Sequence, residues 1–182
     1  MLMIRTPRFE KAVLPHLDAA YNLARWLTRN DHDAEDVVQE AFARALRYFD
    51  SLKDAEARPW ILAIVRNTAY TWLEKNRPAE VVALDEAGLD RAEAEFANLA
   101  GPSDSNPEVI VLQTAQRKLV NQALEELPVA YREVLVMREL EELTYKEIAH
   151  IAAIPIGTVM SRLARGRDLL KGIVERRMRR AS

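Results

Sequence analysis

Hydroxyl and guanidinium side chains recur at helical spacing near the C-terminus, where they could form hydrogen bonds with nucleic acid. Ser161 and Arg165 are four residues apart, so on a helix they share one face and could both reach the edges of DNA bases. Thr158 and Arg162 lie on the flank of that face, where a hydroxyl and a guanidinium group suit phosphate oxygens. These four side chains are the candidate contacts to duplex DNA.

The surrounding sequence predicts two short helices with a turn between them. Thr144 and Glu147 can form a capping box, in which each side chain accepts a hydrogen bond from a backbone N–H group at the helix start. Pro155 lacks an N–H group and disfavours helical geometry in Ile154, so it marks the turn before a second helix that begins near Ile156. This pattern is typical of a helix-turn-helix. On the second helix, the positions expected to pack inward are Val159, Leu163, Gly166 and Leu170.

Charge is unevenly distributed along the 182-residue chain, although the formal net charge is only −2. Residues 1–78 contain 12 Lys and Arg against 11 Asp and Glu, residues 79–108 contain 1 against 8, and residues 109–182 contain 13 against 9. The three net charges are therefore +1, −7 and +4. A basic C-terminal segment favours a polyanionic partner such as DNA. The alternative is an ordinary helical hairpin with a solvated basic face.

The acidic middle segment separates two stretches with helical periodicity. Residues 101–107 contain several helix breakers, so residues 79–108 are expected to form a linker, with a helical part near 85–99. The acidity either serves solubility or lets the linker occupy a basic channel that otherwise holds nucleic acid.

Composition excludes several classes of protein. The chain has no cysteine, which excludes a disulfide framework and a thiolate metal site. No apolar run reaches the roughly 20 residues that cross a bilayer, and the apolar start at residues 1–4 is too short for a signal peptide. We therefore expect a cytoplasmic protein without cofactors and without membrane insertion.

Three apolar patterns before the linker predict a compact helical bundle without strands. The first runs from Phe9 to Leu27, the second has Asp33 as its expected N-cap, and the third begins near Pro59, since proline is favoured in a first helical turn. The buried side of the third helix is expected to carry Trp60, Ile61, Ile64, Val65 and Trp72.

The outer face of this third helix combines an aromatic ring with cationic and amide side chains. Tyr70 could stack on an unpaired base, while Arg66 and Arg77 could attract phosphates. Asn67 could form hydrogen bonds with a base edge. Such residues are also common on solvated helices, so this face alone leaves both interpretations open.

Four separated motifs resemble those of extracytoplasmic-function sigma factors, the sigma-70 family subunits of bacterial RNA polymerase. The motifs are DAEDVVQEAF, RPWILAIVRN, LEELP and IPIGTVMSRL, at residues 33–42, 58–67, 124–128 and 154–163. The resemblance implies an all-α protein of two small helical domains. Sigma region 2 would occupy residues 1–78, the acidic linker residues 79–108, and region 4, with the helix-turn-helix, residues 109–182.

The resemblance further implies a transcription initiation factor that is not an enzyme. Region 2 would melt and recognise the minus-ten element as a single strand, and region 4 would bind the minus-thirty-five element as duplex and contact the β flap of core RNA polymerase. The linker would run toward the RNA exit channel. Members of this family are commonly held by an anti-sigma protein, so we expect one here.

The resemblance also assigns residues to these tasks. Asp36, Gln39 and Glu40 would contact the clamp helices of the polymerase β′ subunit. By the same resemblance, Arg66, Asn67 and Tyr70 would face the non-template strand, and the loop of residues 51–55, which contains Lys53, would help to hold a flipped base. With Arg77 from the outer face of the third helix, the predicted minus-ten surface comprises Lys53, Arg66, Asn67, Tyr70 and Arg77. The predicted minus-thirty-five surface comprises Thr158, Ser161, Arg162 and Arg165.

The sequence departs from the family pattern at two places. Residues 152–153 are Ala-Ala where Leu-Gly is common, and Ala153 weakens the expected helix C-cap because glycine enters the left-handed conformation without penalty. Met160 stands where lysine is frequent, which removes one charge that would attract phosphate.

Two other classes of protein fit parts of the sequence. A one-component regulator with a helical sensor domain would need an apolar ligand cavity within residues 1–78 and tight duplex binding without polymerase. A carboxylate-bridged metal enzyme is suggested by Glu147 and His150, the i,i+3 pair that such bundles use. That site needs a second such pair, which His16 and His32 do not provide.

Overall fold

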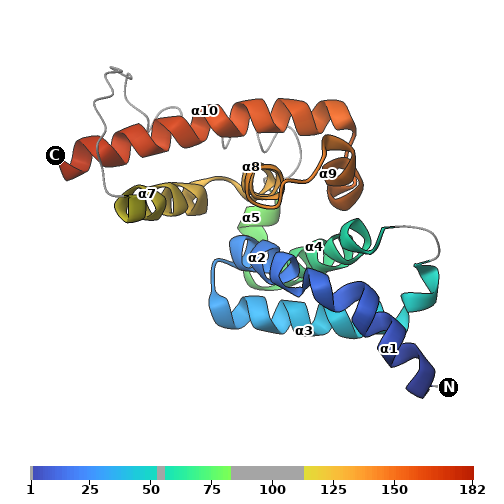
Figure 1. Cartoon of the computed structure of the whole chain (residues 1–182). Helices are drawn as coiled ribbons and strands as arrows, with labels where there is room; N and C mark the ends of the chain where they lie inside the picture. Colours follow the sequence, from blue (N-terminus) through green and yellow to red (C-terminus); the bar gives the residue numbers. More distant parts are fainter. Residues whose placement is uncertain (1, 53–55, 83–112) are drawn as a thin grey trace.

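The computed structural model describes residues 2–52, 56–82 and 113–182. Every regular element in these three ranges is a helix (Figure 1), which confirms the expected all-α class. The helices form two bundles, which we call the N-terminal bundle (α1 to α4) and the C-terminal bundle (α7 to α10). A short helix, α5, lies between them (Figure 1).

The N-terminal bundle consists of four helices: α1 (Leu2–Val13), α2 (Leu17–Thr28), α3 (Asp31–Arg47) and α4 (Ala57–Asn76). Helices α2, α3 and α4 pack against one another, and the apolar side chains between them are excluded from solvent. The first apolar pattern is divided between two helices, because Pro15 lies in a 3₁₀ turn at Leu14–His16 that separates α1 from α2. A second 3₁₀ turn, at Phe49–Ser51, follows α3.

The start of α3 differs from the prediction. Asn30 is the N-cap, because its side chain accepts a hydrogen bond of 3.0 Å from the Asp33 backbone N–H group. Asp33 instead lies in the first turn, where a carboxylate is favoured by the helix dipole. Helix α4 carries Pro59 in its first turn, as expected. Of its predicted buried residues, Ile61 and Val65 are buried, whereas Trp60, Ile64 and Trp72 remain partly exposed.

The C-terminal bundle consists of α7 (Gln113–Glu126), α8 (Val129–Leu135), a π-helical segment (Val136–Leu140), α9 (Tyr145–Ala152) and α10 (Ile156–Ala181). Helices α9 and α10 form the predicted helix-turn-helix. Glu147 N–H donates to Thr144 Oγ1 at 3.2 Å and Thr144 N–H donates to Glu147 Oε2 at 2.7 Å, which confirms the capping box. Between the two helices, Ala153 adopts the left-handed conformation with φ of 54°.

The inward face of α10 follows the predicted spacing. Val159 and Leu163 are fully buried, and Gly166 packs closely against α8, since a Cβ atom there would lie 3.3 Å from Leu135 Cδ1. Leu170, further along the same stripe, is partly exposed.

Helix α5 (Pro78–Val82) lies at the start of the segment predicted as linker. Residues 79–82 are therefore helical, and Glu80 contacts arginine residues of both bundles. The rest of the predicted linker, including the helical part expected near residues 85–99, lies outside the described residues.

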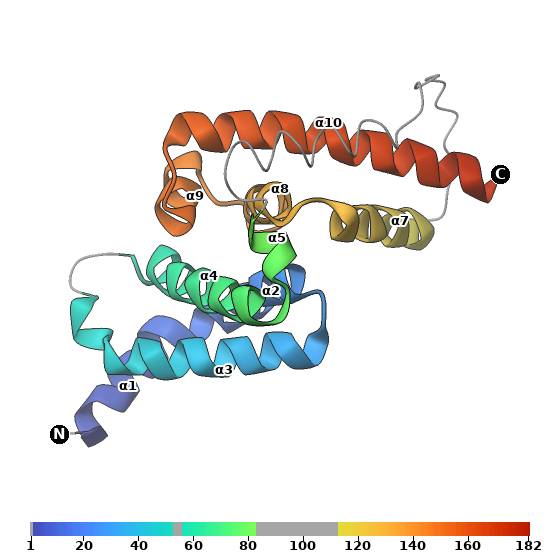
Figure 2. The same cartoon turned by 180° about the vertical axis from the view of Figure 1, so that it is seen from behind.

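The two bundles pack directly on each other. Helices α8 and α9 contact α2 and α4, and buried residues of both bundles belong to one continuous apolar cluster. Figures 1 and 2 show α3 on the side of the N-terminal bundle that faces away from the C-terminal bundle. The interface between the bundles therefore lies along α4 and α2.

Candidate nucleic-acid interface

The exposed face of α10 carries part of the predicted duplex-binding surface. Ser161 and Arg165 are exposed and Thr158 is half-buried, with the Ser161 hydroxyl donating to the Thr158 carbonyl at 3.1 Å. Arg162 was expected on the flank of this face, but only 9% of it is exposed. Its position explains the difference, because Arg162 lies three residues after Val159 and one before Leu163, within the buried stripe of the helix.

The predicted single-strand surface on α4 is mostly covered. Asn67 is exposed, but only 6% of Tyr70 is exposed, and the Arg66 guanidinium group lies over the Tyr70 ring at 3.8 Å from the ring centroid. Tyr70 was expected on the outer face. It is buried because the C-terminal bundle packs against α4 at this point, and Arg66 forms an ion pair with Glu133 of α8.

Burial changes the acid–base behaviour of Tyr70. Its pKa is raised well above the ordinary value of 10.0, first by removal from solvent and then by the nearby Glu133 carboxylate, although Arg66 acts in the opposite direction. The Tyr70 hydroxyl has no hydrogen-bond partner within the described part of the chain. The ring is thus held in its neutral form and away from water.

Of the two remaining residues of the predicted minus-ten surface, the structure describes Arg77. Arg77 is the C-cap of α4, where its guanidinium group lies 5.3 Å from the centroid of the Trp72 ring and 3.7 Å from Glu80 Oε1. Lys53 lies outside the described residues.

Helix α3 presents three exposed polar side chains on one face, Asp36, Gln39 and Glu40. Glu40 forms an ion pair with Arg44 one turn later, and His32 Nε2 lies 3.8 Å from Asp36 Oδ2. These contacts are local to the helix, so this face is accessible to a partner.

The interface between the bundles contains polar residues that the sequence did not single out. Arg58 of α4 donates to the Glu141 backbone carbonyl at 2.6 Å and to Glu141 Oε2 at 3.2 Å, and Asn22 of α2 donates to the same carboxylate. Arg29 Nη1 donates to the Glu125 carbonyl at 3.1 Å. Each pair is separated by more than 80 residues in sequence, so only the tertiary structure brings the partners together.

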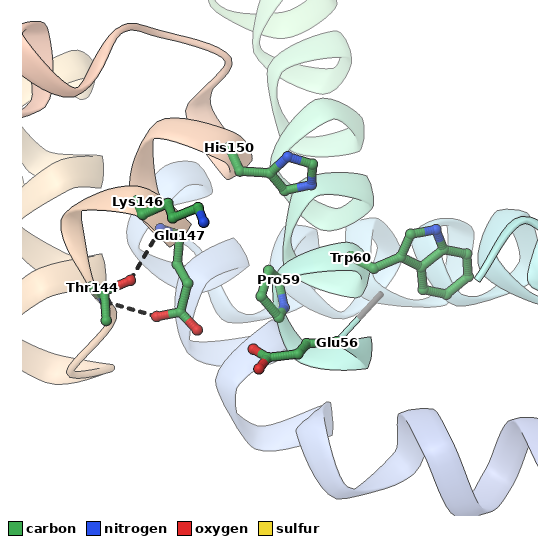
Figure 3. Close-up of a pocket in the computed structure, with 7 residues that line it drawn as sticks. All are labelled: Glu56, Pro59, Trp60, Thr144, Lys146, Glu147 and His150. Carbon is green, nitrogen blue, oxygen red and sulfur yellow. Dashed lines mark hydrogen bonds between the residues drawn. The ribbon is translucent and has the colours of Figure 1, made fainter. Parts of the chain in front are cut away.

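A cavity of about 720 Å³ lies between the start of α4 and helix α9. Figure 3 shows side chains from the two bundles facing each other across it. The lining residues are Glu56, Pro59, Trp60, Thr144, Lys146, Glu147 and His150. This cavity lies between the bundles, unlike the cavity within residues 1–78 that a one-component regulator would need.

Glu147 and His150, the pair that suggested a metal site, lie on α9. The Glu147 carboxylate accepts the Thr144 N–H hydrogen bond of the capping box (Figure 3). In residues 2–52, 56–82 and 113–182, no group of three or more metal-binding side chains comes together. No helix in these ranges is both long and apolar enough to span a bilayer.

Comparison with protein families gives two matches that follow the two bundles. The family model "Sigma-70 region 2" matches residues 12–78, and "Sigma-70, region 4" matches residues 117–170. The chain is 33% identical over 165 residues to the ECF RNA polymerase sigma factor SigE of Mycolicibacterium smegmatis, covering 91% of this chain and 61% of the relative. It is 37% identical over 153 residues to the ECF RNA polymerase sigma-E factor of Escherichia coli K12, covering 81% of this chain and 77% of the relative.

Two solved structures share the fold. The sigma factor RpoE in complex with the anti-sigma factor NepR from Bartonella quintana has a TM-score of 0.66 at 23% identity, with 92% of this chain and 96% of that chain covered. CnrH in complex with the cytosolic domain of CnrY has a TM-score of 0.62 at 22% identity, with 93% and 88% covered. The chain belongs to the extracytoplasmic-function sigma factors of the sigma-70 family, which are alternative sigma factors of transcription initiation.

Proposed function

We propose that this sigma factor divides promoter recognition between its two bundles while α3 holds it on core RNA polymerase. Its activity is one of binding, with no chemical step of its own, and it acts in the cytoplasm. The observation that carries the proposal is that three chemically distinct sets of side chains lie on separate helices. Acidic and amide groups are exposed on α3, and hydroxyl and guanidinium groups are exposed on α10, whereas the arginine and aromatic groups of α4 are covered by the C-terminal bundle.

The face of α10 suits duplex DNA at the minus-thirty-five element. Ser161 and Arg165 are exposed at the start of the second helix of the helix-turn-helix, the part of such a motif that enters the major groove. Thr158 is half-buried beside them and suits a phosphate contact. We leave Arg162 out of this surface because the helix core buries it.

The face of α4 suits the unpaired minus-ten strand. Asn67 offers donors and acceptors to a base edge, and Arg66 and Tyr70 together offer phosphate attraction and a stacking ring. Arg77, the C-cap residue of the same helix, and Lys53, which precedes α4 in the sequence, would extend the track of positive charge along the strand. Arg66 and Tyr70 reach DNA only when the C-terminal bundle moves away from α4.

The face of α3 suits a basic surface on the polymerase. Asp36, Gln39 and Glu40 are exposed within about one helical turn, and they correspond to the family motif for the β′ clamp helices. Region 4 would contact the β flap, and the acidic linker would run toward the RNA exit channel. The likeness to RpoE, whose structure contains an anti-sigma factor, supports regulation of this chain by an inhibitory protein of that kind.

A gel-shift assay with and without core polymerase tests the proposal. A subset of genomic fragments should shift in mobility when the chain and core polymerase are present together, and should shift only weakly with the chain alone. Tight, selective binding by the chain alone would instead support a one-component regulator. The double variant Asp36→Ala with Glu40→Ala tests the face of α3 in the same assay. Its charge-matched control is Asp18→Ala with Glu10→Ala. Because all four side chains are exposed, the comparison separates loss of a specific contact from loss of net charge.

A further inference from the structure

One ion pair joins the two bundles at the surface proposed for the minus-ten strand. Arg66 Nε donates to Glu133 Oε2 at 3.0 Å, and Arg66 Nη2 donates to Glu133 Oε1 at 3.1 Å. The Glu133 side chain is 0% exposed and that of Arg66 is 15% exposed. The contact is therefore bidentate and almost fully removed from solvent.

The chemistry of this pair resembles that of an arginine bound to a nucleic-acid phosphate. A guanidinium group recognises carboxylate and phosphate oxygens with the same two-pronged geometry. The Glu133 carboxylate thus accepts hydrogen bonds from the Arg66 N–H groups that, in the proposed function, bind a phosphate of the unpaired strand. The Arg66 guanidinium group also lies over the Tyr70 ring, where a base would stack.

We propose that Glu133 is an internal competitor of the minus-ten strand. In the free protein its carboxylate binds Arg66 and closes the C-terminal bundle over α4, and it must leave before unpaired bases can bind. This inference rests on the proposed function of Arg66 and Tyr70 as contacts to the single strand.

The closed contact has the features of one that can open. Tyr70 Oη and Arg132 Nε are buried with no hydrogen-bond partner in the part of the chain that the structure describes, and Arg132 Nη2 lies 3.6 Å from Glu80 Oε2, beyond hydrogen-bond distance. Separation of the bundles would return these groups to water and recover their hydration. A buried ion pair adds little net stability, because desolvation of the two charges offsets their attraction.

The other two proposed surfaces remain accessible in the closed form. Asp36 and Glu40 are exposed on α3, and Arg165 is exposed on α10. Helix α3 lies on the side of the N-terminal bundle away from the interface (Figure 2). The closed protein can therefore meet polymerase through α3 while its single-strand surface is covered. This order of contacts would restrict strand capture to the polymerase-bound protein.

Energy transfer between two dyes tests the closed contact. The chain has no cysteine, so Lys75→Cys on α4 and Lys171→Cys on α10, both at exposed positions, provide one label on each bundle. In this background, Glu133→Gln removes the charge and keeps the size of the side chain. It should lower the transfer efficiency of the free protein. The matched control is Glu139→Gln, which removes an exposed carboxylate that pairs with Arg167 inside the C-terminal bundle.

Binding of a single strand tests the competition. The probe is a fluorescent oligonucleotide with the non-template strand of the minus-ten region from a promoter that the polymerase complex transcribes. Glu133→Gln should tighten its binding to the free protein by at least about fivefold, the lower end of typical coupling between sites. Adding Arg66→Ala to this variant should remove the gain, and Glu139→Gln should match the wild type.

A second variant keeps the test decisive if Glu133→Gln does not fold. Arg58→Ala removes the contact to Glu141 at another part of the interface without touching Arg66, and it should change transfer and binding in the same direction. Unchanged transfer in both variants would overturn the proposal, as would lower transfer without tighter strand binding. Failure of the proposed function would appear separately, as the absence of any core-dependent transcript from the wild-type protein.

Discussion

The Glu80 carboxylate of α5 lies 3.6 Å from the Arg132 guanidinium group of α8. The same carboxylate forms ion pairs with Arg29 and Arg77, the C-cap residues of α2 and α4. Arg132 is 1% exposed, and its burial, together with the positive charge of Arg29, lowers its pKa to about 10 despite the opposing effect of Glu80. One carboxylate thus compensates three cations where the N-terminal bundle, α5 and α8 meet.

Replacement of Glu80 by glutamine should destabilise this meeting point. Removal of the carboxylate that pairs with these three guanidinium groups should lower the free energy of unfolding by about 1–3 kcal/mol, less than for a fully buried pair because Glu80 is partly exposed. Urea denaturation of the whole chain measures the change. Glu74→Gln, an exposed carboxylate on α4, is the control and should be neutral. Equal effects of the two substitutions would show that Glu80 has no special role.

Ala153→Gly should stabilise the helix-turn-helix. Ala153 has a φ of 54°, and a non-glycine residue in the left-handed region costs about 1–2 kcal/mol. The variant should therefore raise the urea midpoint by an amount equivalent to about 1 kcal/mol with an unchanged slope. Ala152→Gly, one residue earlier in the buried last turn of α9, should lower the midpoint instead. If both variants lower it, the strain assigned to Ala153 is absent.

Arg165→Ala and Arg162→Ala should separate DNA recognition from stability. Arg165 is exposed, so its loss should weaken binding of the polymerase complex to the minus-thirty-five duplex by about 1–3 kcal/mol and lower the urea midpoint less than Arg162→Ala does. Arg162 is buried, so its loss should lower the midpoint first. Fluorescence anisotropy on duplex DNA, with urea denaturation alongside, distinguishes the two. An Arg165→Ala variant with full duplex affinity would remove Arg165 from the surface.

The double substitution Asp36→Ala with Glu40→Ala should weaken binding to core polymerase by about 0.5–2 kcal/mol, as expected for the loss of two exposed charge pairs. Both side chains are exposed on α3, so the fold should be unaffected. Native-gel titration against core polymerase gives the dissociation constant. Asp18→Ala with Glu10→Ala removes the same charge from other exposed positions and should bind normally. Normal binding by the Asp36 and Glu40 variant would refute the assignment of α3.

The fold class and the helix-turn-helix could be predicted because their signals are local. The capping box at Thr144 and Glu147, the proline turn at residue 155 and the inward stripe of α10 each depend on residues within a few positions of one another. The structure differs from the prediction where neighbouring residues offered an alternative N-cap or an alternative helix face. Asn30 rather than Asp33 caps α3, and Arg162 lies on a stripe that its neighbours had already defined as buried.

The closed interface could not be predicted from the sequence. Glu133 and Arg66 are 67 residues apart, and periodicity gives no signal for a pair that forms only when two bundles meet. Tyr70 was expected to be exposed because the apolar stripe of α4 indicates only which residues pack inside the N-terminal bundle. It gives no signal for residues that the C-terminal bundle covers. The pattern placed Arg66, Asn67 and Tyr70 on one helix, and the packing of the two bundles determined which of them are exposed.

Run-off transcription on genomic fragments tests the central claim most directly. Purified core polymerase, with and without the chain, is given a library of genomic fragments, and the start sites are mapped. Discrete transcripts with common start sites should appear only when the chain is present, and they should weaken with Arg165→Ala and with the Asp36 and Glu40 double variant. The same start sites and yields with and without the chain would contradict the account.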